Sequence, residues 1–193
     1  MYNQNNMNSS TLTEAYISVD VETAGPYPER YSLLSIGACT IAEPRETFYV
    51  ELKPVSEEMT DKAISIHGLS LAALAERGLE PAEAMSRFEK WLADHTPPGQ
   101  RPVFVAFNAA FDWMFINYYF YRYLGHNPFG HAALDIKAFY MGLAGVPWAE
   151  TTMKYVGPRY LHNRPLTHQA LHDALDQANI FHKMLLEALN RGR

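Results

Sequence analysis

Cysteine, basic residues and long apolar runs are all scarce in this chain of 193 residues. Its single cysteine, Cys39, cannot form a disulfide within the chain, which favours a reducing compartment and predicts a cytoplasmic protein. No apolar run is long enough to cross a membrane, and the first residues lack the basic start and the apolar stretch of a signal peptide. We therefore expect no membrane partner.

The charge balance is acidic, with 16 Lys and Arg against 21 Asp and Glu and a net charge of −5. This balance argues against a protein that holds long nucleic acid by charge alone. It does not exclude an enzyme that holds a short single-stranded end. Two bound divalent cations would bring the total to about −1, because metal ions are often the largest charges in a site.

The length suits one domain with a sizeable core, and the chain contains no internal repeat and no linker that would divide it. Residues 1–13 are predicted to be a disordered tail, because residues 1–11 are mostly Asn, Gln and Ser. Residues 14–193 remain as the single folded domain.

Strand patterns come first along the chain and then alternate with helical patterns. The short connection Glu43-Pro-Arg joins the second and third apolar runs into a predicted hairpin, and residues 151–167 are expected to be irregular. The predicted strands are residues 15–20, 33–41, 46–52, 102–107 and 131–135, and the predicted helices are residues 70–77, 81–94, 110–124, 136–143 and 169–190. Together they predict an α/β fold with a mixed sheet of about five strands flanked by helices.

Two carboxylates, Asp20 and Glu22, end the first predicted strand. Alternate side chains of a strand point to the same side, so both acids face one way while Val19 and Val21 face the core. Acids beside an apolar strand are costly unless something neutralises them, and a hard divalent cation prefers oxygen ligands. The alternative is a solvated strand end with two surface acids, which this short motif alone does not exclude.

Asp112 follows the buried strand at residues 102–107 by one short turn, Asn108-Ala-Ala-Phe. The C-terminal ends of strands are where α/β sheets place their sites, so Asp112 is a further candidate. Its alternative interpretation is an ordinary acid in the first turn of a helix.

His168 and Asp173 stand at the start of the last predicted helix. Five residues on one helix separate two side chains by about 140°, so the pair would not share a face. If His168 lies on the loop before the helix, which Pro165 favours, its side chain is free to swing over the carboxylates. Otherwise His168 is a helix-start histidine with no task. The neighbouring His172 is a rival that should point elsewhere on the helix.

Three signatures are specific as a set. Asp20-Val-Glu-Thr closes a strand, Asn108-x-x-Phe-Asp follows a buried strand, and His168-x-x-x-x-Asp-Ala opens the last helix. The set resembles the DEDDh exonucleases, a family with a ribonuclease H-like fold that includes polymerase proofreading subunits, ribonuclease T and oligoribonuclease. The resemblance covers nearly the whole chain from about Tyr16 onward, and it departs at Phe107, where many members have histidine.

The resemblance implies a 3′→5′ exonuclease that hydrolyses phosphodiester bonds at the 3′ ends of single-stranded DNA or RNA and releases nucleoside 5′-monophosphates. It implies that His168 is the general base and that two Mg²⁺ or Mn²⁺ ions activate the attacking water and stabilise the leaving oxygen. The implied metal ligands are Asp20, Glu22, Asp112 and Asp173, and the implied substrate contacts are Thr23, Ala24, His67, Asn108 and Phe111. Asp135 is interpreted as a helix cap rather than a ligand.

Two other functions fit parts of the pattern: a catalytically silent module that binds nucleic acid or a partner on the same fold, and a metal-dependent endonuclease. The presence of all four acids and His168 favours the exonuclease. A homodimer is expected from the resemblance alone.

Two segments outside the signatures have residues that suit nucleic acid. Residues 151–172 contain no acid and include Lys154 and Arg159, so they form either a phosphate-contacting region or a solvated loop. The run Tyr118-Tyr-Phe-Tyr-Arg-Tyr could stack bases. Aromatic residues at helical spacing more often pack in a core or at a dimer contact.

Overall fold

The computed structural model describes residues 14–161 and 168–191 of the chain. The predicted tail at residues 1–13 lies outside these described residues, and so do His162 and Arg164 of the segment without acids at residues 151–172. Within the described ranges, no helix combines the length and the apolar character needed to span a bilayer.

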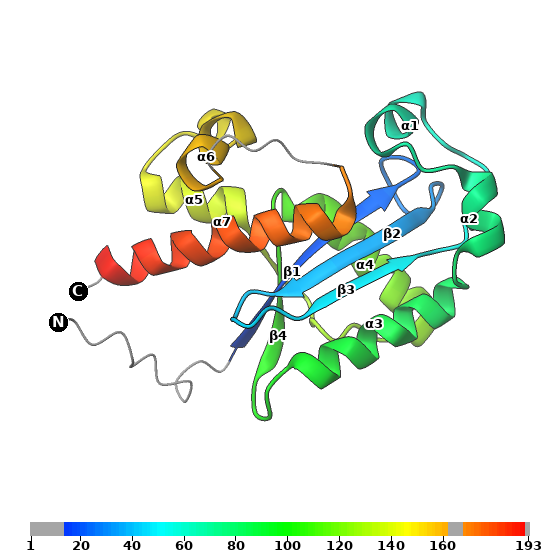
Figure 1. The fold of residues 1–193 in the computed structure, drawn as a ribbon, viewed down its shortest axis with the longest axis horizontal. Helices are drawn as coiled ribbons and strands as arrows, with labels where there is room; N and C mark the ends of the chain where they lie inside the picture. Colours follow the sequence, from blue (N-terminus) through cyan, green and yellow to red (C-terminus); the bar gives the residue numbers. More distant parts are fainter. Residues whose placement is uncertain (1–13, 162–167, 192–193) are drawn as a thin grey trace.

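A mixed sheet of five strands forms the centre of the fold, in the order β3-β2-β1-β4-β5 (Figure 1). The strands are β1 (Glu14–Thr23), β2 (Leu33–Thr40), β3 (Thr47–Glu51), β4 (Arg101–Ala106) and β5 (Ala133–Asp135). β1 pairs with β2 and β2 with β3 in antiparallel register, whereas β1 with β4 and β4 with β5 are parallel. The predicted α/β class, the hairpin and the number of strands are confirmed.

Side chains of β1 alternate between two packed layers. Ile17, Val19 and Val21 belong to an aromatic-rich core cluster with α3 (Pro81–His95) and α4 (Ala109–Leu124). On the opposite face, the Ser18 hydroxyl donates to the Ala174 carbonyl of α7 (Ala170–Arg191), the long helix in front of the sheet (Figure 1). The even-numbered residues of β1, which include Asp20 and Glu22, therefore face the α7 side, as the alternation predicts.

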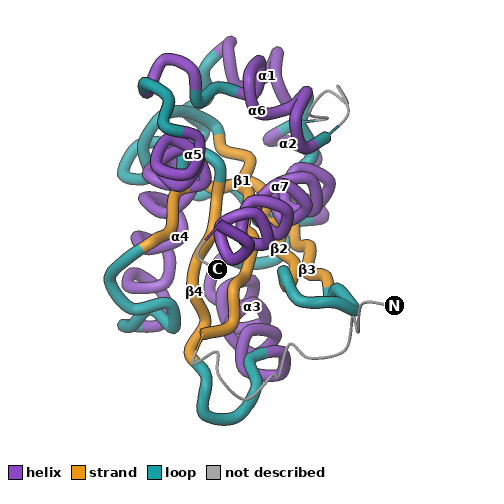
Figure 2. The backbone as a smooth tube through the Cα atoms, turned by 90° about the vertical axis from the view of Figure 1, so that its left-hand side faces the viewer, coloured by secondary structure: helices purple, strands orange, loops and turns teal. Residues whose placement is uncertain are grey.

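The remaining helices surround the end of the sheet at which β1 finishes. Figures 1 and 2 both place α1 and α6 at the same end of the molecule. These helices are α1 (Asp61–His67), α2 (Leu71–Arg77), α5 (Ile136–Ala144), the short 3₁₀ helix η1 (Trp148–Glu150) and α6 (Met153–Tyr160).

Two helices depart from the sequence prediction. Residues 151–167 are predicted to be irregular, but Met153–Tyr160 form α6 even though Pro158 lies inside it. The apolar side chains Val156 and Tyr160 are buried in the cluster around α7, and this packing outweighs the backbone hydrogen bond that a proline removes. Helix α1 has no strong apolar period, so the sequence pattern does not predict it.

Candidate active site

Four carboxylates from three separate segments meet where β1 ends. Asp20 and Glu22 extend from β1, while Asp112 and Asp173 lie in the first turns of α4 and α7. One ligand oxygen from each of Asp20, Glu22 and Asp173 lies within 4.8 Å of the others, the charge of Asp112 acts on Asp20, and the charge of Glu22 acts on Asp112. Glu22, Asp112 and Asp173 are each less than one tenth exposed, which rules out a solvated strand end.

Hydrogen bonds from the protein orient three of these carboxylates. The Val21 amide donates to Asp112 Oδ1 at 3.1 Å, so the helix carboxylate is tied to the strand that carries its partners. The His168 amide donates to Asp173 Oδ2 at 3.0 Å. Each bond leaves carboxylate lone pairs available, because an ionised carboxylate accepts at about four positions.

Gln177 orients Asp20 and is a residue that the sequence interpretation missed. Its Nε2 donates to Asp20 Oδ1 at 2.6 Å, and its Oε1 accepts from the Phe107 amide at 2.9 Å. The side chain is 2% exposed, so both of its bonds are made inside the fold. The available signal was a polar residue one helical turn after Asp173, on the face of α7 that packs on the sheet.

Burial and mutual repulsion disfavour negative charge in this cluster. Desolvation, followed by the charge of Asp112, raises the pKa of Asp20 well above its ordinary value. Desolvation, with a contribution from Asp173, raises the pKa of Glu22 to about 7, and desolvation raises the pKa of Asp112 to about 8. Divalent cations stabilise the ionised form and prefer carboxylate oxygens, so this donor set fits divalent metal ions.

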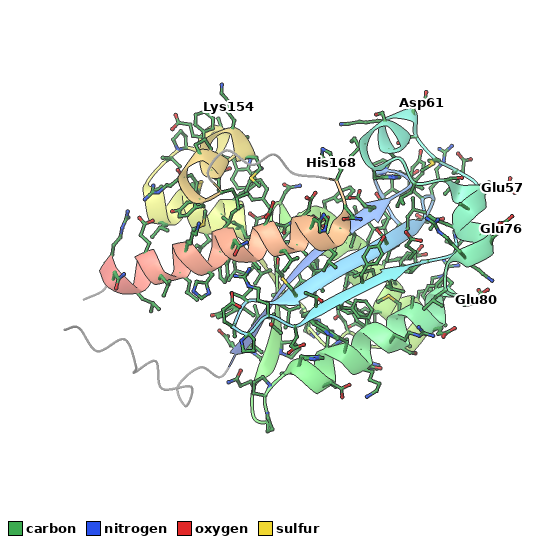
Figure 3. The ribbon with its side chains drawn as sticks, in the orientation of Figure 1. Glu57, Asp61, Glu76, Glu80, Lys154 and His168 are labelled. Carbon is green, nitrogen blue, oxygen red and sulfur yellow. The ribbon has the colours of Figure 1, made fainter. Side chains whose placement is uncertain are left out.

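His168 lies on the loop before α7, the position that its predicted role requires. It is exposed, and in Figure 3 it stands between α1 and α6. Its φ of 53° and the φ of 67° at Asn108 are the two positive values among the described residues other than glycine. These residues precede the helices that carry Asp173 and Asp112, and such backbone conformations tend to gather at functional sites. The assignment of His168 as general base stays a prediction.

His67 connects α1 to the end of β1. The Leu69 amide donates to His67 Nδ1 at 3.0 Å, so the ring hydrogen sits on Nε2, which donates to the Thr23 carbonyl at 3.1 Å. The Thr23 hydroxyl donates to the Gly25 carbonyl at 2.9 Å. Both side chains therefore hold the rim of the site in place, and their predicted contact with substrate remains a prediction.

The other predicted substrate contacts differ in accessibility. The Ala24 amide already donates to the Ser32 carbonyl at 2.8 Å. Asn108 is exposed directly before α4, and Phe111 is half-buried with its ring centroid 5.5 Å from that of Phe115. Asn108 and Phe111 thus remain open to a ligand, whereas Ala24 has its backbone N–H committed.

Asp135 is a helix cap, as predicted. One of its carboxylate oxygens accepts from the Ala138 amide of α5 at 2.9 Å, and the other accepts from the Ala109 amide of α4 at 2.7 Å. The second bond fixes the start of the helix that carries Asp112.

The segment at residues 151–172 partly makes contacts within the fold. Arg159 pairs with Glu187 of α7 at 2.6 Å and is therefore turned away from the four carboxylates of the candidate site. Lys154 is exposed on α6, at the top of the view in Figure 3. Within the described part of this segment, Lys154 is thus a better candidate for a phosphate contact than Arg159.

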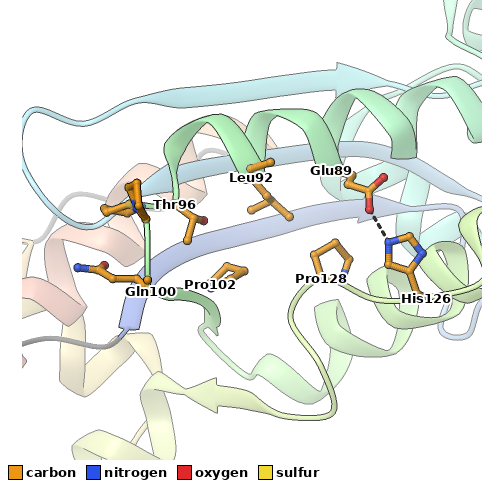
Figure 4. A pocket seen from close by; sticks show the side chains of 11 residues that line it. Glu89, Leu92, Thr96, Gln100, Pro102, His126 and Pro128 are labelled. Carbon is orange, nitrogen blue, oxygen red and sulfur yellow. Dashed lines mark hydrogen bonds and ion pairs between the residues drawn. The ribbon is translucent and has the colours of Figure 1, made fainter.

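A hollow of about 360 Å³ opens at the opposite end of the sheet, where β4 begins (Figure 4). Pro97, Pro102 and Pro128 contribute to its wall, and Glu89 is hydrogen-bonded to His126 there. Asp112 follows the opposite end of β4, so this hollow does not belong to the carboxylate site.

Gly37 of β2 allows α7 to approach the sheet beside Asp20, its partner in the strand register. A Cβ at residue 37 would lie 2.2 Å from the backbone of Ala170 and Leu171. We expect Gly37→Ala to reduce the free energy of unfolding by about 1–3 kcal/mol and to weaken divalent-ion binding, because α7 and Asp173 must move. Urea unfolding and a metal titration measure the two effects.

Gly142→Ala is the matched control. Gly142 lies in α5, and a Cβ there would meet nothing within 4 Å. It should leave metal binding unchanged and stabilise the helix slightly. Equal behaviour of the two variants would contradict the close approach of α7 at Gly37.

Comparison with known sequences supports the chemistry of this site. A family model described as "Exonuclease" (RNase T) matches residues 17–181. The chain is 48% identical over 171 residues to the 3′-5′ DNA exonuclease Cap18 of Escherichia coli, across 89% of this chain and 91% of that protein. It is 26% identical over 181 residues to ribonuclease T of Buchnera aphidicola subsp. Baizongia pistaciae, across 88% of this chain and 82% of that protein.

Solved structures share the fold at low sequence identity. The nuclease domain of 3′hExo, a DEDDh family member bound to rAMP, aligns with a TM-score of 0.75 at 18% identity, covering 92% of this chain and 94% of that one. E. coli exonuclease I in complex with a dT13 oligonucleotide aligns with a TM-score of 0.72 at 15% identity, covering 92% of this chain and 42% of that one. The sheet order and its helical layers are thus those of a ribonuclease H-like exonuclease.

Proposed function

This chain belongs to the RNase T exonuclease family and is a 3′→5′ exonuclease of the DEDDh type, and we propose that its preferred substrate is single-stranded DNA. The preference for DNA is supported by the 48% identity to a protein named as a DNA exonuclease, against 26% for a ribonuclease. We propose Mg²⁺ as the cation.

The convergence of four carboxylates from three segments is the observation that carries the chemistry. Asp20, Glu22, Asp112 and Asp173 would hold the divalent cations, which supply Lewis-acid stabilisation of the charge that develops on the phosphate. A silent binding module would have no use for this arrangement, because four acids held together without cations destabilise the fold.

His168 is assigned the proton transfer. In hydrolysis the oxygen of a water molecule bonds to phosphorus, the bond from phosphorus to the upstream 3′-oxygen breaks, that oxygen takes a proton from solvent, and a nucleoside 5′-monophosphate leaves. The His168 ring would take the proton that the attacking water loses, and its position on the loop before α7 lets it approach the phosphate once a strand is bound. Gln177 and Val21 hold Asp20 and Asp112 in place during this step.

The proposed preference predicts a difference in rate between matched strands. Single-stranded DNA and RNA of one sequence, labelled at the 5′ end, are incubated with enzyme and Mg²⁺ or with EDTA. We expect a ladder that shortens from the 3′ end only with Mg²⁺, and a rate on DNA higher by about tenfold to a hundredfold, the range over which pockets discriminate a single hydroxyl group.

The two parts of the proposal fail separately. An equal or faster rate on RNA would refute the DNA preference and leave the exonuclease activity in place. Internal fragments without a ladder would indicate an endonuclease. Activity that persists in EDTA would contradict the role of the carboxylates.

A further inference from the structure

The outer face of α4 carries a second open hollow, of about 620 Å³. It lies on the side of α4 turned away from the sheet, since Ile116, Tyr119 and Phe120 face the core. The lining residues are Pro28, Met114, Asn117, Tyr118, Tyr121 and Arg122. We call these residues the α4 platform. None of them is acidic, although the chain has a net charge of −5.

Arg122 presents a guanidinium cation on this surface, positioned by neighbouring tyrosines. Its Nη1 donates to the Tyr118 hydroxyl at 2.9 Å, and its guanidinium lies 5.7 Å and 5.6 Å from the ring centroids of Tyr118 and Tyr123. The ion pairs found among residues 14–161 and 168–191 do not include Arg122. A guanidinium fixed by rings and without a carboxylate partner is suited to an anion such as phosphate.

Tyr121 supplies an exposed ring beside this cation. Its side chain is 45% exposed, on the face of α4 opposite to the core. Rings of this kind stack nucleobases without sequence preference, because every base has an aromatic face. An exposed aromatic ring next to an arginine that has no ion-pair partner among the described residues is therefore a pattern that fits single-stranded nucleic acid.

The platform is continuous with the carboxylate site. Phe111, Met114, Tyr118 and Arg122 follow one another at helical spacing and form one stripe along α4. Phe111 directly precedes Asp112, and Pro28 belongs to the connection that leaves the site end of β1. From Phe111 to Arg122 the helix rises about 16 Å, which is enough for a few nucleotides of an extended strand.

We propose that the α4 platform binds the substrate strand a few nucleotides upstream of the bond that is cut, with a base stacked on Tyr121 and a phosphate on Arg122. This inference rests on the proposed function, because it concerns the same strand. A second copy of the chain is the competing occupant, since exposed tyrosines also suit a dimer contact.

The test uses two variants, one for stacking and one for charge, and strands of two lengths. Binding of fluorescent DNA strands with phosphorothioate linkages is measured in Mg²⁺, for a trinucleotide and for a strand of about ten nucleotides. The variants are Tyr121→Ala and Arg122→Gln. The controls are Tyr49→Ala on β3 and Arg87→Gln on α3, an exposed tyrosine and an exposed arginine away from the platform.

Each variant has its own expected signature. Tyr121→Ala should weaken binding of the longer strand about tenfold, leave the trinucleotide unchanged, and keep the salt dependence. Arg122→Gln should reduce the slope of log affinity against log salt by about 0.7, the contribution of one phosphate contact on a single strand. Turnover of a trinucleotide with ordinary phosphodiester linkages, too short to reach the α4 platform, should match wild type in both variants.

Three results would count against the inference or its premise. Affinities of both variants that match the controls at every length would overturn the platform. Dissociation of a dimer by either variant, seen by light scattering, with strand affinity unchanged would assign the surface to a second copy. Failure of the wild type to cut any strand would refute the proposed function, while the binding data would still decide the platform.

Discussion

The Asp20→Asn variant is expected to lose about a thousandfold or more in the rate of strand shortening. Asn keeps the size of the side chain and an oxygen that accepts from Gln177, but it removes one negative charge from the carboxylate cluster that would hold the cations. A loss of about 4 kcal/mol of transition-state stabilisation corresponds to about a thousandfold in rate, and divalent cations contribute several kcal/mol in such sites. The rate is measured with 5′-labelled single-stranded DNA in Mg²⁺.

The same variant should be more stable than wild type in EDTA at alkaline pH. Folding raises the pKa values of Asp20, Glu22 (to about 7) and Asp112 (to about 8), so the folded state binds more protons than the unfolded state. Linkage then requires the wild-type free energy of unfolding to fall as pH rises through these values. We expect the Tm in EDTA to fall from about pH 5.5 to about pH 8.5, and Mg²⁺ to raise it most at the higher pH.

Glu57→Gln is the matched control, because it removes one negative charge from an exposed position at the edge of the fold (Figure 3). It should keep full activity and the wild-type response of Tm to pH and Mg²⁺. In Asp20→Asn the fall of Tm with pH should be smaller and the Mg²⁺ shift should nearly vanish. An Asp20→Asn protein that retains both activity and the Mg²⁺ shift would show that Asp20 is not a ligand.

The sequence predicts the strands well because the apolar residues that recur along each strand are also the residues that the sheet buries. Residues 102–107 are predicted as a strand and form β4 one residue earlier, and the helices predicted at residues 70–77 and 110–124 are α2 and α4, each within one residue of its expected start. Helix α6 could not be predicted in the same way, because Gly157 and Pro158 disfavour a helix locally. Its stability comes from contacts with α7, which are distant in the sequence.

The same distinction between local patterns and distant contacts applies to the residues of the candidate site. The positions of Asp20, Glu22, Asp112 and Asp173 could be predicted because each follows from a strand end or a helix start in a known order. The role of Gly37 could not be predicted, and the role of Gln177 was indicated only by its spacing from Asp173, because the importance of both residues lies in a contact across the fold. Gln177 reaches Asp20 from α7, and Gly37 makes room for α7. Such contacts depend on how α7 docks on β1 and β2, which no local pattern encodes.

His168→Ala is expected to lower the rate by about a hundredfold to ten-thousandfold, the usual contribution of a general base, while metal binding is kept. The two effects can be separated because Asp173 Oδ2 accepts from the His168 backbone amide, not from its ring. Alanine retains that amide, so Asp173 should remain in place for the cations. The rate is measured on 5′-labelled single-stranded DNA, and metal binding is measured from the Mg²⁺-induced shift in Tm.

His172→Ala is the control for this prediction, since His172 is exposed on α7 directly before Asp173 and should be dispensable. Added imidazole should restore part of the rate of His168→Ala, because a free base can occupy the space that the ring leaves. A lost Mg²⁺ shift in His168→Ala would mean that the residue acts through the metal ligands instead. An equal loss of rate in His172→Ala would show that His168 is wrongly assigned as the base.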